Sequence, residues 1–112
     1  MFRIRKISDD FWSANQSAIS QVQSIISGQF PTARKKDIEA IPARLHDPIK
    51  FGYQTLLFVA EKSGGKVAGF AILLLFVKEK FAWLEYVSVA PGPNGGGVGG
   101  ALYQKVRDEA KS

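Results

Sequence analysis

Residues 87–102 read VSVAPGPNGGGVGGAL, and they carry the most specific structural pattern of the chain. Six of the eleven glycines of the chain fall between Gly92 and Gly100. The apolar residues before the glycines are typical of a strand. After them, Val98, Leu102 and Val106 recur every four residues, which predicts a helix over 97–110. The stretch therefore reads as a strand, a glycine-rich loop and a helix.

This arrangement favours the binding of an anion. Glycines have no Cβ, so a ligand can approach the backbone closely. The first amides of a helix lack intrahelical acceptors, and the positive end of the helix dipole attracts negative charge. Since no charged residue lies between Tyr86 and Lys105, backbone amides would hold the anion. A flexible turn or close helix–sheet packing is the alternative, but so many glycines cost conformational entropy on folding.

The chain before this stretch predicts one strand and two helical segments. Residues 2–7 alternate apolar and basic side chains, as a first strand does. Residues 11–26 carry apolar residues at helical spacing, with Asp9 or Asp10 as the expected N-cap and Gly28 as the expected end. A second helical stripe follows, interrupted near Pro42, and it comprises Ile38, Ile41 and Leu45.

Three strands follow in an antiparallel meander. They are expected at Thr55–Glu61, Val67–Lys78 and Phe81–Val89, with turns at residues 62–66 and 79–80. The continuous apolar run of the middle strand predicts burial on both faces. The order β-α-α-β-β-β-α describes an α+β domain with a mixed, mainly antiparallel sheet flanked by helices.

The last strand carries a spacing that predicts a β-bulge. Leu84 and Val87 are three residues apart, whereas Val87 and Val89 are two apart. A period of two places Leu84 and Val87 on one face only if an extra residue is inserted between them. A strand that is buried on both faces and has no bulge is the alternative.

Three phosphate-binding schemes compete for the glycine loop. Gly95, Gly97 and Gly100 match the dinucleotide fingerprint literally, but that motif needs a following parallel strand and a later acidic residue, and it does not follow an antiparallel meander. A P-loop needs Lys and Ser or Thr after its last glycine, where this chain has Ala101 and Leu102.

The third scheme is the acetyl-CoA signature of the GNAT acetyltransferase superfamily, which this segment resembles. The tripeptide Val89-Ala90-Pro91 is similar to the end of the family's strand. Residues 94–99, NGGGVG, resemble its Arg/Gln-Gly-x-Gly-x-Gly/Ala loop, and Leu102 matches the first core-facing helix residue. Asn94 departs from the usual Arg or Gln. The order of elements also matches over nearly the whole chain, which looks similar to the modules that precede a deacetylase-type amidohydrolase domain in some bacterial proteins.

The resemblance implies acetyl-CoA as the co-substrate and assigns residues to it. Backbone groups of the strand would pair with the pantetheine arm, and the loop would hold the pyrophosphate. Glu85 is the only carboxylate of the strand, and it could take the proton of an attacking amine; an exposed strand glutamate is the alternative. The implied cofactor-binding residues are Val87, Ser88, Val89, Asn94, Gly95, Gly96, Gly97, Val98, Gly99 and Gly100.

The resemblance also implies that a complete family member continues after the signature helix with a β-α-β-β part. We therefore expect residues 1–112 to form a single acetyltransferase-like domain that lacks this part. It would be either a fragment of a larger enzyme or a short homologue. The strand Phe81–Val89 would be an open edge, which tends to pair with another chain, and a homodimer through it is expected.

The predicted function is transfer of an acetyl group from acetyl-CoA to an amine of a small molecule or a protein. The alternative is a non-catalytic module that binds CoA or a nucleotide as a sensor or in assembly. The net charge of +5 is dispersed, so nucleic acid is not favoured. No apolar run is long enough to span a membrane. The lack of cysteine excludes disulfides and thiolate metal sites, and the lone His46 does not make a metal site, so no metal is expected. The expected location is the cytoplasm.

Overall fold

The computed structural model describes residues 2–46, 52–89 and 97–111. Its elements confirm the predicted α+β class, although the second helical segment is divided at Ala40 into two short helices, with Pro42 in the first turn of the second. In chain order they are β1 (Phe2–Ile7), α1 (Ser13–Gln29), α2 (Lys35–Glu39), α3 (Ile41–His46), β2 (Gln54–Lys62), a 3₁₀ turn (Ser63–Gly65), β3 (Val67–Phe76), β4 (Phe81–Val89) and α4 (Val98–Lys111).

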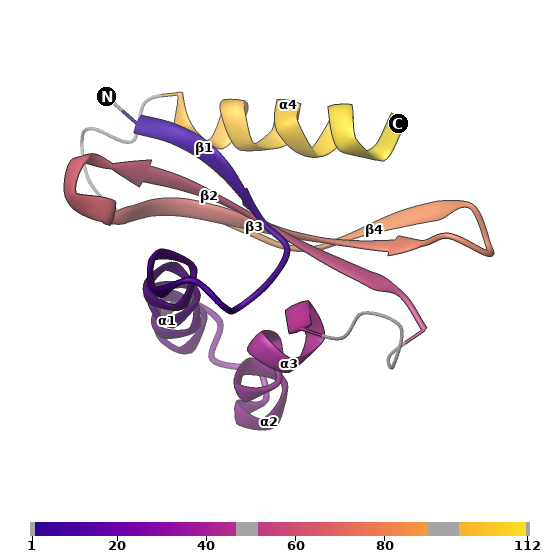
Figure 1. Ribbon diagram of the computed structural model, residues 1–112, viewed down its shortest axis with the longest axis horizontal. Coiled ribbons are helices and arrows are strands. Elements are labelled where there is room, and N and C mark those ends of the chain that lie inside the picture. Colours follow the sequence, from indigo (N-terminus) through magenta and orange to yellow (C-terminus); the bar gives the residue numbers. More distant parts are fainter. Residues whose placement is uncertain (1, 47–51, 90–96, 112) are drawn as a thin grey trace.

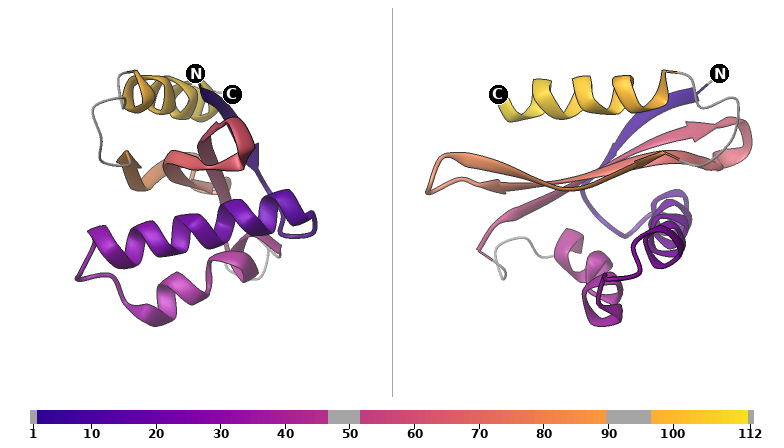
Figure 2. Two further views of the ribbon diagram at one scale, coloured as in Figure 1. Left: turned by 90° about the vertical axis from the view of Figure 1, so that its left-hand side faces the viewer. Right: turned by 180° about the vertical axis from the view of Figure 1, so that it is seen from behind.

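The four strands form one antiparallel sheet in the order β1-β2-β3-β4. Helix α4 covers one face of this sheet, and α1, α2 and α3 cover the other, so that the sheet is the middle of three layers (Figures 1 and 2). Strand β4 is an outer strand of the sheet in the described part of the chain, as the sequence predicts.

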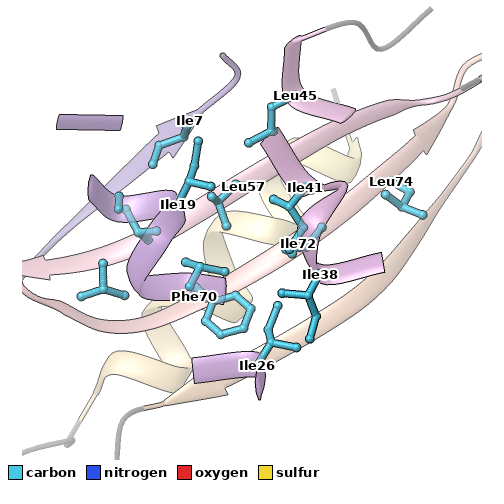
Figure 3. Close-up of a cluster of buried hydrophobic side chains, with 14 residues drawn as sticks. Ile7, Ile19, Ile26, Ile38, Ile41, Leu45, Leu57, Phe70, Ile72 and Leu74 are labelled. Carbon is cyan, nitrogen blue, oxygen red and sulfur yellow. The ribbon is translucent and has the colours of Figure 1, made fainter. Parts of the chain in front are cut away.

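A large apolar core lies between the sheet and α1, α2 and α3 (Figure 3). Its helix side includes the predicted stripe Ile38, Ile41 and Leu45, and its sheet side includes Phe70 and Ile72 of β3. A second core lies beneath α4, where Val98, Leu102 and Val106 meet Ala71 and Leu73. Since β3 contributes to both cores, its apolar run is buried on both faces from Val67 to Leu74, as predicted.

The β2–β3 turn is the glycine turn that the sequence predicts, whereas helix α1 begins and ends differently from the prediction. Gly64 and Gly65 have φ angles of 85° and 82°, which glycine adopts without a Cβ clash. The expected cap at Asp9 or Asp10 was wrong: Asp9 Oδ1 accepts from the Phe11 amide before the helix, and Asp10 pairs with His46. The expected end at Gly28 was also wrong. Helix α1 continues to Gln29, and Gly28 is exposed within it.

Arg5 joins β1 to both β2 and α1. Its Nε lies 2.7 Å from Glu61 Oε1, and its Nη1 donates to Asn15 Oδ1. The hydrogen bond from Arg5 lowers the pKa of Glu61, while partial burial opposes that shift. The edge strand β1 is therefore held by a charged contact in addition to its ladder.

Candidate functional site

The β-bulge that the sequence predicts is present in β4. Leu84 pairs with Leu73 and Tyr86 pairs with Ile72, so Glu85 is the extra residue on the β4 side. Val87 pairs with Ala71, and both Ala71 and Leu73 belong to the core beneath α4. Because paired residues share a face of the sheet, Leu84 and Val87 lie on the same face, as their spacing predicts.

Beyond the bulge, β4 is anchored to the layer of α1. The Tyr86 ring packs edge-on against Phe30 with 5.1 Å between the centroids. Ser88 is buried, and its hydroxyl donates to Gln29 Oε1 at the end of α1. Burial raises the pKa of the Tyr86 phenol, and the Glu85 carboxylate adds to this effect. Tyr86 therefore remains protonated at neutral pH.

Glu85 is not the freely exposed strand glutamate of the alternative interpretation. Its Oε1 accepts from Nη2 of Arg44 in α3 at 2.7 Å, and its Oε2 lies 3.5 Å from Nη1. The Glu85 side chain keeps 27% of its surface exposed, whereas that of Arg44 keeps 8%. Arg44 is a site residue that the sequence pattern did not predict. One sequence signal could have found it: Arg44 lies three positions after Ile41, which places a charged residue on the buried face of a short helix.

Helix α4 begins at the glycine residues that the sequence singles out. Gly97 has a φ of 85° and its carbonyl accepts the first helical hydrogen bond, from the Ala101 amide at 2.9 Å. The amides of Val98, Gly99 and Gly100 precede that bond, so α-helix geometry gives them no acceptor within α4. No acidic side chain lies in the first turn. The positive end of the helix is therefore not neutralised by its own residues.

The glycines of this turn serve different purposes. Gly97 adopts a left-handed φ that favours glycine. A Cβ on Gly99 would lie 3.4 Å from Cγ2 of Val89, an ordinary contact with the end of β4. A Cβ on Gly100 would meet nothing within 4 Å, and Gly100 is exposed. Neither packing nor backbone strain within the described chain requires glycine at position 100.

Gly69 of β3 is a further residue that the sequence analysis missed. A Cβ there would lie 2.9 Å from both the Ser88 carbonyl oxygen and Cγ1 of Val98, and 3.2 Å from Leu102 Cδ1. Gly69 thus lets the first turn of α4 approach the sheet directly beside the end of β4. A glycine within a strand can signal such a close approach, but the sequence does not say to which element.

The structure therefore brings Val89, Gly97, Val98, Gly99 and Gly100 together at one end of the sheet. Val87 is half-exposed on the α4 face, and Ser88 is directed instead towards α1. The remaining predicted loop residues, Asn94, Gly95 and Gly96, lie outside the described residues. Within residues 2–46, 52–89 and 97–111, no group of three or more His, Cys, Asp or Glu side chains could hold a metal ion. No helix in these ranges could cross a membrane.

Comparison with known proteins agrees with this geometry. Residues 19–112 match the model of the acetyltransferase (GNAT) family, and the chain belongs to that family. A search of curated protein sequences finds no match.

Solved structures show the same fold. GCN5 of Tetrahymena is 22% identical with a TM-score of 0.75, and the match covers 99% of this chain and 63% of GCN5. The catalytic domain of the same histone acetyltransferase in complex with coenzyme A is 20% identical with a TM-score of 0.72, covering 99% and 62%. A protein of Desulfovibrio desulfuricans assigned to the GNAT family is 19% identical with a TM-score of 0.70, covering 99% and 67%. The chain thus spans less than two thirds of the GCN5 chains.

The close approach at Gly69 leads to a first prediction. Gly69→Ala would force the new methyl group against the Ser88 carbonyl and two α4 side chains, and we expect a loss of about 1–3 kcal/mol in unfolding free energy. Gly28→Ala is the matched control, because a Cβ on Gly28 meets nothing within 4 Å. It replaces an exposed helical glycine and should stabilise by up to about 1 kcal/mol. Urea unfolding followed by circular dichroism measures both, and equal effects would contradict the close approach.

Proposed function

We propose that this chain binds acetyl-CoA and transfers its acetyl group to an amine. Membership of the GNAT family and the shared fold support this function. The observation that carries it is the first turn of α4, where three successive amides begin the helix, no acidic residue occupies the turn, and Gly100 has no packing reason to be glycine. A phosphate-bearing ligand that approaches this backbone closely accounts for all three features.

The proposed cofactor site extends from this turn along the end of β4. The amides of Val98, Gly99 and Gly100 would hold the pyrophosphate, together with Asn94, Gly95, Gly96 and Gly97 of the loop. Backbone groups of Val87, Ser88 and Val89 would pair with the pantetheine arm beyond the bulge, since β4 is an outer strand of the described sheet. No metal enters this scheme. A cytoplasmic setting is proposed with it, supported by the absence of cysteine.

The proposed chemistry is a direct attack on the thioester. The neutral amine nitrogen forms a bond to the acetyl carbonyl carbon, the carbon–sulfur bond breaks, and CoA leaves as the thiolate. Glu85 would accept the proton that the amine loses. Its carboxylate is partly exposed, and each oxygen that faces Arg44 keeps a second lone pair. The proposed acceptor is thus a small molecule or protein whose amine reaches this face of β4.

A charge substitution at the first turn of α4 tests cofactor binding. Gly100→Asp places a negative charge where the pyrophosphate would lie, and we expect at least a tenfold loss of affinity for CoA by isothermal titration calorimetry. Gly100→Asn is the isosteric neutral control and should bind within about threefold of the wild type. The aspartate should not weaken the fold, because acidic residues in a first turn stabilise helices. If wild-type protein does not bind CoA, or if both variants bind equally, the proposed site is wrong.

A second candidate function is a non-catalytic module that binds CoA as a sensor or in assembly. The ion pair of Glu85 with Arg44 favours it, because this carboxylate is already engaged. An acetylation assay over a panel of amines separates the two functions. We expect transfer by the wild type and a fall of about 100-fold or more in kcat for Glu85→Gln, which keeps an oxygen for Arg44 but cannot accept the proton. CoA affinity should change little in this variant. Binding without turnover on any amine would support the sensor.

We also propose that β4 (Phe81–Val89) pairs with a second copy of the chain along the part before the bulge, which leaves the edge of Val87–Val89 to the pantetheine arm. This outer strand exposes large apolar side chains on both faces, with Phe81 and Trp83 on one and Leu84 and Val87 on the other. Sedimentation velocity over a concentration series should show self-association that Trp83→Lys weakens, since an edge lysine opposes strand pairing. Trp12→Lys, which changes an exposed tryptophan before α1, is the control. A wild-type protein that stays monomeric throughout the series would refute this pairing.

A further inference from the structure

Arg44 is a buried cation whose charged partner is the extra residue of the bulge. Its guanidinium contacts Glu85 through Nη2 and Nη1, and its Cζ lies 5.5 Å from the centre of the Tyr53 ring. Its Nε is buried without an acceptor among the described residues. A guanidinium in such surroundings is stable only while its remaining hydrogen bonds are kept, so Glu85 is held at this position.

The position of Glu85 determines which way the rest of β4 faces. Glu85 is the residue that pairs with nothing on β3, between Leu84 opposite Leu73 and Tyr86 opposite Ile72. Without the extra residue, Tyr86 would pair with Ala71 and would lie beneath α4 rather than against Phe30. Ser88 would likewise lose Gln29. The register of Tyr86–Val89 therefore depends on whether Glu85 remains outside the ladder.

The contact also connects two layers of the molecule. Arg44 belongs to α3, on the face of the sheet opposite to α4, whereas Ser88 and Val89 at the end of β4 lie beside the first turn of α4 (Figure 1). Glu85 has no paired residue opposite it on β3, whereas the hydrogen bond from Nη2 of Arg44 holds its carboxylate at 2.7 Å. Arg44 can thus influence the position of β4 through its contact with Glu85.

We propose that Arg44 is a positioning residue of the acetyl-CoA site: by holding Glu85 outside the β3–β4 ladder, it fixes the register of Tyr86–Val89, the half-strand that the cofactor would use. The expected effect of Arg44 on CoA binding rests on the proposed function. The claim about register stands on the contacts within the chain alone.

The test combines CoA titration with amide hydrogen exchange of β4 in the full chain. Arg44→Met keeps much of the apolar stem but removes the contact with Glu85. We expect CoA affinity to fall about tenfold, which corresponds to an interaction free energy in the middle of the range found for residues in contact. Amides of residues 86–89 should exchange at least tenfold faster, while those of β2 change less. Arg44→Lys keeps the charge and one donor and should recover part of both effects; it also serves if Arg44→Met fails to fold.

Val106→Ala is the control for a loss of stability alone. Val106 is a residue of α4 that is buried against the sheet, on the face opposite to α3 (Figure 1). Its truncation weakens the fold without changing the contact between Arg44 and Glu85. If Arg44→Met and Val106→Ala change exchange and affinity in the same way, Arg44 is merely structural and the proposal is overturned. If the wild type does not bind CoA, the proposed function fails. The exchange of residues 86–89 in Arg44→Met then still decides the register claim.

Discussion

The pairing of β3 with β4 leaves out one residue of β4, Glu85. The part of β4 before Glu85 and the part after it therefore pair with β3 in registers that differ by one residue. Before the bulge, Leu84 lies on the α4 face opposite Leu73. After it, Tyr86 packs on Phe30, and Ser88 bonds to Gln29 on the opposite face. A slip of one residue would reverse every side chain of one half. The arrangement of the layers and the placement of the candidate site both depend on this single insertion.

The close approach of α4 to the sheet is the second condition for the site. Gly69 removes the Cβ that would separate β3 from Val98 and Leu102, so the first turn of α4 lies beside the end of β4. The glycines of that turn oppose helix formation by about 1 kcal/mol each. Burial of Val98, Leu102 and Val106 contributes about 1.5–3 kcal/mol for each side chain, which is the larger effect. Tertiary packing therefore outweighs the low helix propensity of the glycines at the start of α4.

The sequence predicted those features that repeat along the chain. Alternation located β1, apolar runs between turns located β2 and β3, the period of four located α4, and the irregular spacing of Leu84, Val87 and Val89 located the bulge. Other features depend on residues far apart in the sequence. Arg44 and Glu85 are 41 positions apart, and the clash that Gly69 avoids involves both Ser88 and Val98. Local signals also misled at α1, because the helix continues through Gly28 to Gln29, and Asp9 accepts a hydrogen bond from the Phe11 amide before the helix begins.

The cofactor and the acceptor would meet at β4 from different faces of the sheet. The amides of α4 begin on one face, whereas Glu85 and Arg44 belong to the other, and residues 86–89 connect them. A charge introduced at the start of α4 acts directly on an anionic ligand, because it changes the potential where that ligand lies. A change at Arg44 can reach the same ligand only through the backbone of β4. In the proposed function, the bulge would therefore be the point at which the binding of the cofactor and the deprotonation of the amine are coupled.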